Sequence, residues 1–373
     1  MALIIVLSVF NGFEGLITSL FNAFNPDFSV TATKGKTFHF DDFPVDSLRK
    51  IPGVYFVTQV VEENALLKYR DKQYIATIKG VSSGFEQMSG IDTMLIDGSF
   101  VLKDGEMQRM IMGAGVAYYL GASLLDLLNP VTVFVPQREG DIGLSIEGAF
   151  NSKNIFPSGV FSIQQEFDSK YVIVPIEFVR ELVNYDDEVT SVEIGLSKGF
   201  DSELVKQKIK NLAGAGYTVK NRYEQELLLY KIMKSEKWAI FFILTFILII
   251  ATFNVISSLT MLILDKKKDI AILHSMGAAD RLIRLVFLIE GVMISVGGAL
   301  AGLILGGIVS WIQQQFGIIS LGGGTGSFVV DAYPVKIIFT DFLLVFVTVV
   351  VIGFLAAWYP VTRISNKYLT QKL

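Results

Sequence analysis

The sequence predicts an α-helical membrane protein with four transmembrane helices and a large α+β extracytoplasmic domain inserted between the first and second of them. Three observations lead to this prediction. The chain is 51% hydrophobic, yet it carries 36 acidic and 32 basic residues, so an apolar part and a soluble part share one polypeptide. Long apolar runs occur at the start of the chain and in its last third, from residue 238 onward. Residues 25–237 between them contain no such run.

Each apolar run is long enough to cross a bilayer. A helix rises about 1.5 Å per residue, so about 20 residues cross a hydrocarbon core ~30 Å thick. We therefore divide the chain, in order, into a first transmembrane helix (1–24), the α+β domain with a helical stalk (25–237), a second transmembrane helix (238–264), a cytoplasmic coupling segment (265–284), a third transmembrane helix (285–312), a short extracytoplasmic loop (313–338), a fourth transmembrane helix (339–360) and a cytoplasmic tail (361–373).

Basic residues predict the orientation of these helices. Lys266, Lys267, Lys268, Arg281 and Arg284 lie close to the apolar runs on either side of the coupling segment. Positive charge of this kind marks the cytoplasmic side of a membrane protein. Both termini are then cytoplasmic, and the domain at 25–237 lies on the opposite side of the membrane.

Short apolar runs separated by turn signals predict the elements of the α+β domain. The expected strands are 28–33, 54–61, 64–69, 73–81, 131–136, 160–165, 171–174, 191–196 and 217–221. The expected helices are 45–51, 111–122, 176–183 and 201–212, with a helical stalk at 224–237. The last strand, helix and strand before the stalk form a β-α-β unit.

One long stretch of this domain, 138–157, has no regular pattern and is interpreted as a loop. Loops of about twenty residues inside a compact domain are usually functional or disordered. This one carries many apolar residues for a solvated segment: Ile142, Leu144, Ile146, Phe150, Ile155 and Phe156. A flexible loop and a protruding binding segment both remain open.

The coupling segment itself has helical periodicity. Ile270, Ile272, Leu273 and Met276 recur at helical spacing, and Gly277 suits the left-handed residue that ends a helix. Two interpretations remain open: an amphipathic connector lying in the membrane interface, or a docking element for a cytoplasmic partner.

Two motifs connect this chain with a known family. The segment Asp269-Ile-Ala-Ile-Leu-His-Ser-Met-Gly-Ala278 resembles the (Glu/Asp)-Ile-Ala-Ile-Leu-(Arg/Lys)-x-x-Gly-Ala segment of FtsX-like ABC permeases. His274 stands where that family has Arg or Lys. Leu-Ser-Val-Phe-Asn11-Gly-Phe-Glu14 is similar to a segment in the first membrane helix of the lipoprotein-releasing (Lol-type) permeases. Family members carry more chain before this match, so we expect the native protein to begin further upstream.

The resemblance implies a non-catalytic permease subunit in the bacterial inner membrane with a MacB-like periplasmic domain. It implies release of lipoproteins to a periplasmic carrier by mechanotransmission, with ATP and Mg on a separate cytoplasmic ABC ATPase, so this chain needs no cofactor. The expected partners are that ATPase, a second permease copy or paralogue, the carrier, lipoprotein substrates and membrane lipid. Export of a drug, peptide or toxin by an FtsX/MacB-type permease is an alternative, as is a scaffold relaying an ATPase cycle to a cell-wall hydrolase.

The resemblance also assigns roles to residues. The expected ATPase-docking residues are Lys267, Asp269, Ile270, Ile272, Leu273, His274, Met276 and Gly277. The expected residues at the substrate cavity and permease interface are Asn11, Phe13, Glu14 and Asn254. For Asn11 and Glu14, a helix near its exit from lipid remains an alternative. The apolar residues of 138–157 are the expected carrier-binding hook.

Other chemistries are not indicated by the sequence. Gly298, Gly302 and Gly306 recur every fourth residue and predict close helix packing. There is no cysteine, and the two histidines, His39 and His274, are expected on opposite sides of the membrane, so we expect no metal site. The glycine run 322–326 lacks the spacing of a phosphate-binding loop. A net charge of −4 without a basic, aromatic-rich cluster does not suggest nucleic acid as a partner.

Overall fold

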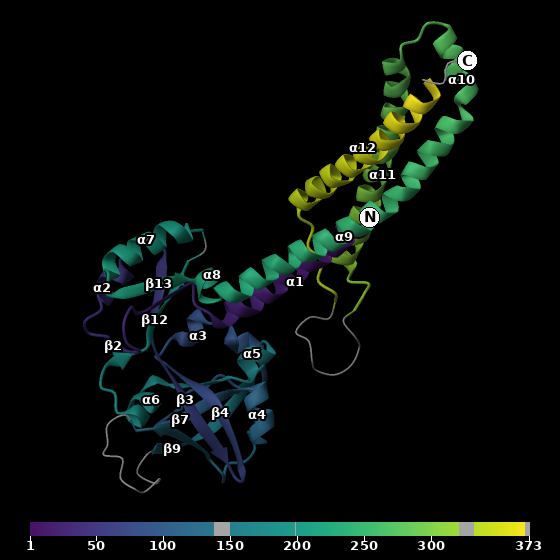
Figure 1. The fold of residues 1–373 in the computed structure, drawn as a ribbon. Helices are drawn as coiled ribbons and strands as arrows, with labels where there is room; N and C mark the ends of the chain where they lie inside the picture. The colour runs from purple at the N-terminus through teal and green to yellow at the C-terminus, as the bar shows by residue number, and fades with distance from the viewer. Residues whose placement is uncertain (138–149, 198, 321–331, 370–373) are drawn as a thin grey trace. The chain divides into compact units, whose positions relative to one another are not determined.

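The computed structural model describes residues 1–137, 150–197, 199–320 and 332–369. The chain divides into two compact units (Figure 1). The helical unit consists of Met1–Ile17 and Leu228–Leu373, and the sheet unit consists of Thr18–Leu227. Helix α1 (Ala2–Phe24) contributes residues to both units. Each unit is described by itself below.

The helical unit contains the long apolar helices that the sequence predicts. Besides α1 they are α9 (Leu227–Asp265), α11 (Asp280–Phe316) and α12 (Phe339–Leu369), with the short α10 (Lys267–Ser275) between α9 and α11. Four helices in the described part of the chain are long and apolar enough to cross a membrane. In α9, large apolar side chains such as Phe242, Phe246 and Phe253 are exposed on the surface of the unit. A helix with this pattern is suited to lipid around it.

Helix α9 is one continuous helix of 39 residues. It begins just after the short α8 (Arg222–Gln225) and includes most of the predicted stalk as well as the whole of the predicted span at 238–264. At about 1.5 Å per residue its length is ~58 Å, roughly twice the thickness of the hydrocarbon core. Part of α9 must therefore extend beyond any bilayer that it crosses.

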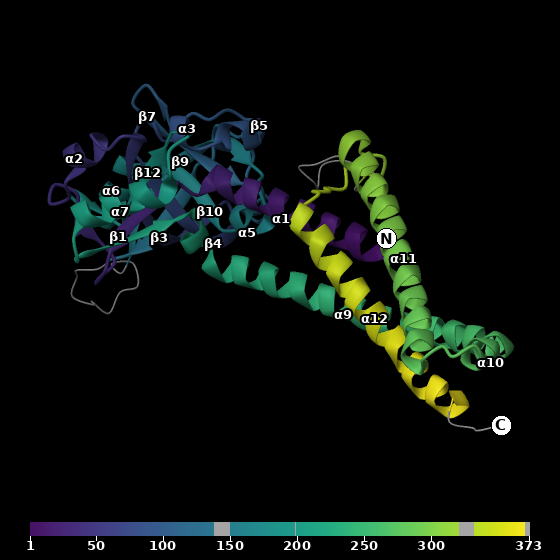
Figure 2. The ribbon, with the colours of Figure 1, turned by 90° about the horizontal axis from the view of Figure 1, so that it is seen from above.

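Small residues permit close contact between α11 and α12, which lie side by side (Figure 2). A side chain added at Gly291 would meet Ala357, and one added at Gly353 would meet Ser295. In the predicted glycine series, Gly302 and Gly306 lie against Met1, and Gly306 also lies against Ile4 of α1. An added side chain at Gly298 would meet no described atom within 4 Å. Backbones approach closely where such small residues meet.

The sheet unit is built on an eleven-stranded sheet in the order β13-β1-β12-β3-β4-β10-β7-β9-β5, with β6 paired to β7 and β8 paired to β3 and β9. The strands are β1 (Phe28–Ala32), β3 (Val54–Tyr69), β4 (Lys72–Val81), β5 (Leu95–Gly98), β6 (Lys103–Asp104), β7 (Met107–Gly113), β8 (Val131–Pro136), β9 (Phe150–Phe161), β10 (Tyr171–Pro175), β12 (Ser191–Leu196) and β13 (Tyr217–Asn221). A separate pair joins β2 (Phe38–His39) to β11 (Glu188–Val189).

Strand β3 belongs to two parts of this sheet. Its first half pairs with β12, and its second half pairs with β8, while β4 pairs along most of its length. The pairs β3-β4-β10-β7-β9-β8-β3 close a ring of strands. In the other part, β1 lies between β12 and β13 and is antiparallel to both. The helix α7 (Ser202–Ala213) connects β12 to β13, as in a split β-α-β unit.

Short helices complete the sheet unit. They are α2 (Val45–Arg49), α3 (Phe85–Met88), α4 (Ala114–Leu120), α5 (Gln165–Asp168) and α6 (Ile176–Val183), with a 3-10 turn at Ile91–Met94. Asp201 caps α7 by accepting hydrogen bonds from the backbone N–H groups of Glu203 and Leu204. The buried core joins both parts of the sheet and consists mainly of Val, Ile, Leu and Phe side chains.

Three sequence predictions in this unit are wrong. The helix expected at 111–122 begins only at Ala114, because Met110, Ile111 and Met112 are all fully buried in β7. A strand buried on both faces gives a continuous apolar run that periodicity does not distinguish from a helix. The irregular stretch expected at 138–157 is wrong over 150–157, and the strand expected at 160–165 is wrong in its bounds, because β9 covers residues 150–161. Residues 138–149 lie outside the described residues. Its polar start resembled a loop, yet Asn151 and Lys153 hydrogen-bond to Leu182 and Gln108 within the unit.

Candidate functional site

The segment between α9 and α11 presents apolar side chains in two directions. Ile270 packs against a buried cluster that includes Ile263, Ile283 and Phe287. Ile272, Leu273 and Met276 are instead 59%, 47% and 79% exposed. We call these three exposed side chains the coupling surface. Apolar side chains exposed at a polar helical turn are typical of a surface that contacts another protein.

The charges and turn of this segment hold α10 in place. Lys266 Nζ lies 3.1 Å from Asp269 Oδ2, and His274 Nδ1 lies 3.4 Å from Asp280 Oδ1 at the start of α11. Gly277 has φ of +90°, the left-handed conformation expected from the sequence at the end of this helix. Lys267 is engaged in an interaction of its own. The coupling surface therefore lies on a short helix with fixed ends.

A buried polar cluster joins three helices of the same unit. Asn11 Nδ2 of α1 donates to Asp341 Oδ2 of α12 at 2.6 Å. Lys237 Nζ of α9 donates to Asn11 Oδ1 at 2.8 Å and to Asp341 Oδ2 at 3.1 Å. Asn11 is 2% exposed and Asp341 is 7% exposed. We call Asn11, Lys237 and Asp341 the helix-joining cluster.

The residues expected at a substrate cavity do not gather in one place. Asn11 is used within the helix-joining cluster, and Phe13 packs edge-on against Tyr333 at 5.1 Å. Glu14 is half-buried. Asn254 is exposed on α9, and the 17 residues after Lys237 place it ~25 Å along the helix from the cluster. Sequence reasoning missed Lys237 and Asp341; the signal was a lone acidic residue at the start of the last apolar run.

The structure describes three of the expected carrier-binding residues, and these differ in their exposure. Ile142, Leu144 and Ile146 lie outside the described residues. Phe150 is 44% exposed at the first position of β9, opposite Pro136 of β8. Ile155 is 1% exposed in the sheet core, so its assignment to a binding surface is wrong. Phe156 is partly buried beneath the Arg109 guanidinium, whose carbon lies 5.9 Å from the ring centre.

Comparison with known families assigns both units. Residues 241–369 match the family described as "FtsX-like permease C-terminal", and residues 1–212 match "MacB-like periplasmic core domain". The second match covers more than half of the chain. The chain belongs to the FtsX-like permeases with a MacB-like periplasmic core domain. This confirms the family expected from the two sequence motifs.

Full-length relatives of this FtsX-like permease carry Lol names. It is 23% identical over 389 residues to "Lipoprotein-releasing system transmembrane protein LolE" of Haemophilus influenzae, covering 100% of this chain and 90% of the relative. It is 25% identical over 360 residues to the LolC protein of Buchnera aphidicola, covering 96% of this chain and 86% of the relative. The crystal structure of the periplasmic region of MacB from Actinobacillus actinomycetemcomitans has 14% identity and a TM-score of 0.39, covering 54% of this chain and 92% of that one.

The family defines the general class of this protein. It is a permease subunit of an ABC transporter and a membrane protein with a periplasmic domain. The described structure supplies the sheet-rich domain and the four apolar helices that this class requires. Because its relatives are components of ABC transporter systems, an ATPase partner is implied.

Proposed function

We propose that this chain releases lipoproteins from the bacterial inner membrane to a periplasmic carrier, as the permease subunit of an ATP-driven transporter. The observation that carries the proposal is the similarity to proteins of lipoprotein-releasing systems over essentially the whole chain. Similarity of that extent covers both the sheet unit and the membrane helices, so it applies to a whole permease rather than to one shared module.

In this mechanism the coupling surface receives the ATPase. Ile272, Leu273 and Met276 enter an apolar pocket of that subunit, and Ile270 fixes α10 to the ends of α9 and α11. ATP and Mg are bound by the partner, and this chain supplies no catalytic group. Closure of the ATPase dimer then displaces α10.

The continuous helix α9 transmits that displacement. It runs without a break from Asp265, beside α10, to Leu227, which follows the last elements of the sheet unit. A rigid helix carries a movement at one end to the other with little loss. The helix-joining cluster makes α1 and α12 move with α9. A pair of permeases, identical or related, expels the acylated substrate between them.

The carrier is received by the residues that connect β8 to β9. Phe150 begins β9 at this end of the strand pair and is exposed there. Replacing residues 140–148 by a glycine–serine linker of equal length should abolish crosslinking to the carrier while the thermal unfolding of the chain stays unchanged. The replaced segment ends before β9 because Ile155 of that strand belongs to the core.

Reconstitution tests the function as a whole. The chain, its ATPase and an acylated lipoprotein are placed in proteoliposomes, and transfer of the lipoprotein to soluble carrier is measured. We expect release to require ATP and the acyl chains. A non-acylated version of the same protein is the matched control. ATP-dependent export of a soluble peptide or drug without release of the acylated protein would contradict the proposal.

A further inference from the structure

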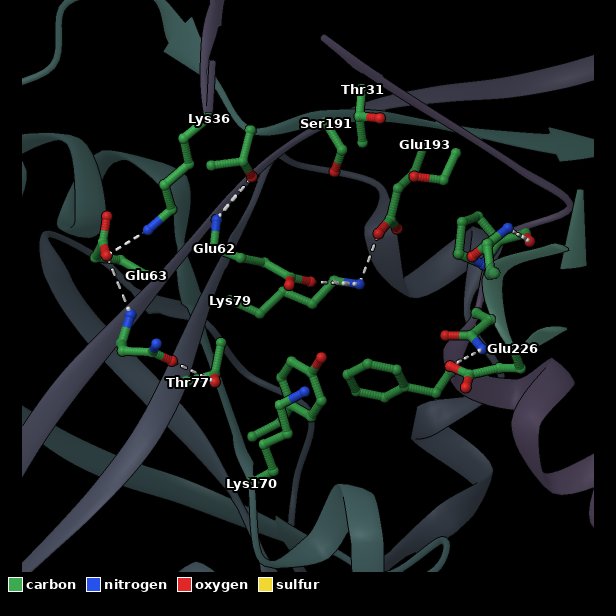
Figure 3. A pocket seen from close by; sticks show the side chains of 18 residues that line it. Thr31, Lys36, Glu62, Glu63, Thr77, Lys79, Lys170, Ser191, Glu193 and Glu226 are labelled. Atoms are coloured by element: carbon green, nitrogen blue, oxygen red, sulfur yellow. Dashed lines mark hydrogen bonds and ion pairs between the residues drawn. The ribbon is translucent and has the colours of Figure 1, made fainter. Parts of the chain in front are cut away.

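The sheet unit contains a polar cavity of about 490 Å³ (Figure 3). Its walls come from β1, β3, β4, β10 and β12, together with residues 24–26 at the end of α1 and residues 225–226 between α8 and α9. The cavity was not anticipated from the sequence, because its lining residues are spread over nearly 200 positions. Such a concave, largely preformed site with convergent polar groups is typical of ligand binding.

A buried ion cluster forms the centre of the cavity. Lys79 Nζ lies 2.6 Å from Glu193 Oε1 and 3.5 Å from Glu62 Oε1. It also lies 4.7 Å from the ring centre of Phe24. Lys79 is 2% exposed and Glu193 is 3% exposed. Figure 3 shows the Lys79 amine between the two carboxylates. The ammonium group is thus fully occupied by groups of the chain.

One carboxylate oxygen in this cluster accepts no hydrogen bond from the described residues. Glu193 Oε2 is buried and has no hydrogen-bond partner among the described residues. Burial raises the pKa of Glu193, and the Lys79 ammonium offsets this only in part. Buried acceptors in native proteins are normally paired, so an orphaned one indicates a missing donor.

The other charges around the cavity do not supply that donor. Lys36 binds Glu63, and Lys170 lies 4.8 Å from the ring centre of Tyr171. Burial and then the negative charges of Glu62, Glu226 and Glu193 raise the pKa of the Tyr171 hydroxyl. The cavity is therefore a site of negative potential with a free buried acceptor.

We propose that this cavity binds a ligand through a primary ammonium group that donates to Oε2 of Glu193. A guanidinium prefers two free carboxylate oxygens for a bidentate contact, and Glu193 offers one. A divalent cation needs several converging oxygens, whereas Glu193 offers one oxygen that no described group occupies. An ammonium on a flexible aliphatic stem satisfies both constraints. It can belong to a free diamine or to a lysine side chain of a polypeptide.

The test is calorimetric titration of the full chain in detergent with two probes. One probe is 1,5-diaminopentane, and the other is N-acetyl-lysine methylamide, which presents a lysine side chain in peptide form. The control ligands carry no ammonium group: they are N,N′-diacetyl-1,5-diaminopentane and the Nε-acetylated form of the lysine derivative. We expect an ammonium-bearing probe to bind and its acetylated form not to bind. Binding by the diamine alone indicates a free amine, and binding by the lysine derivative indicates a polypeptide.

Variants locate the site. Glu193→Gln removes the charge and should weaken binding about 10- to 100-fold, the effect of losing one charge-assisted hydrogen bond. Glu106→Gln, at an exposed carboxylate away from the cavity lining, is the matched control and should bind as wild type does. Undiminished binding by Glu193→Gln would overturn the proposal.

A measurement on the wild-type chain guards against misfolding of that variant. A carbodiimide activates a carboxylate, and an amine in direct contact then forms an amide with it. Mass spectrometry should find the bound probe attached to Glu193. Absence of binding by both probes, or attachment only at exposed carboxylates, would overturn the proposal. It is independent of the lipoprotein-release function, so either can fail alone.

Discussion

Each unit contains a cluster of buried polar groups, and the two clusters differ in how their members are hydrogen-bonded. In the helical unit, the members of the helix-joining cluster bond to one another: Lys237 donates to Asn11 and Asp341, and Asn11 donates to Asp341. In the sheet unit, the Lys79 cluster leaves Glu193 Oε2 without a hydrogen-bond partner in the part of the chain that the structure describes. The two units also differ in where their apolar side chains lie. The sheet unit buries its apolar core, whereas the helical unit exposes large apolar side chains along α9.

This difference indicates what each unit contacts. A polar cluster between apolar helices fixes their relative positions, because Asn11 and Asp341 are buried and losing a partner there leaves a buried polar group unpaired. A cluster with a free acceptor is suited to receive a further molecule. Exposed apolar helices are suited to lipid and protein partners. The polar contacts of the helical unit therefore join its helices, and its exposed apolar side chains are available to lipid or to another protein.

The largest effect should come from breaking the buried ion cluster of the sheet unit. Lys79→Met leaves Glu193 and Glu62 without their cation, and Glu193 is 3% exposed. We expect a loss of about 3–5 kcal/mol in the free energy of unfolding. Urea unfolding of the full chain in detergent, followed by circular dichroism, measures it. The double variant Lys79→Met/Glu193→Leu should recover most of the loss, and an equally unstable double variant would show that charge pairing is not the cause.

The next effect tests the exposed apolar surface of the helical unit. Replacing Ile272, Leu273 and Met276 by Ser should weaken ATPase binding by about 100-fold, as expected for a few central apolar contacts. Thermal unfolding should not change, because these side chains are exposed. The matched control is Ile270→Ala, which removes packing within the unit and should lower stability more than ATPase binding. Retained co-purification of the triple variant with the ATPase would refute the docking assignment.

A smaller effect is expected in the helix-joining cluster. Asp341→Leu removes the acceptor of both Asn11 and Lys237. The Lys237 side chain is 26% exposed, so its ammonium can turn toward water, and we expect a loss of about 1–3 kcal/mol. Asp341→Asn keeps an acceptor and should cost less. Thermal unfolding in detergent compares them. A stability equal to wild type in both variants would mean that the cluster does not hold α1, α9 and α12 together.

Local features of these units could be predicted from the sequence. The helix Ile176–Val183 and the strands Ser191–Leu196 and Tyr217–Asn221 were predicted with the bounds that the structure gives. Their signals lie within a few residues: alternation, helical periodicity and turn residues. Gly277 was likewise identified from its own neighbours, and the structure gives it the left-handed conformation expected there.

Long-range partners could not be predicted in this way. Asn11 and Asp341 are 330 positions apart, and Lys79 and Glu193 are 114 positions apart. A lone polar residue in an apolar run shows that a partner exists without showing which residue it is. The prediction for the first residues of β9 was wrong for a related reason. Asn151 and Lys153 look like loop residues until Leu182 and Gln108 are placed beside them by the fold.

The smallest effect concerns an exposed ion pair, which sharpens the contrast with the two buried clusters. His39 Nδ1 lies 2.6 Å from Asp187 Oδ1, and the His39 side chain is 58% exposed. The hydrogen bond and charge of Asp187 raise the pKa of His39, and the pKa of Asp187 is lowered in turn by its hydrogen bond to His39. The stability that comes from the raised pKa of His39 is fully present below the unfolded pKa of about 6.5, and it is lost as pH rises through the folded pKa.

The stability that comes from the lowered pKa of Asp187 is lost in the opposite direction, as pH falls below the unfolded pKa of about 3.9 and through the folded pKa. The wild type and His39→Gln should therefore differ most in unfolding free energy between about pH 4 and 6.5 and converge at about pH 9. Because the pair is exposed, about 1 M salt should remove this difference, whereas the effect of Lys79→Met should persist in the same salt. A salt-resistant difference at His39 would place that pair with the buried clusters.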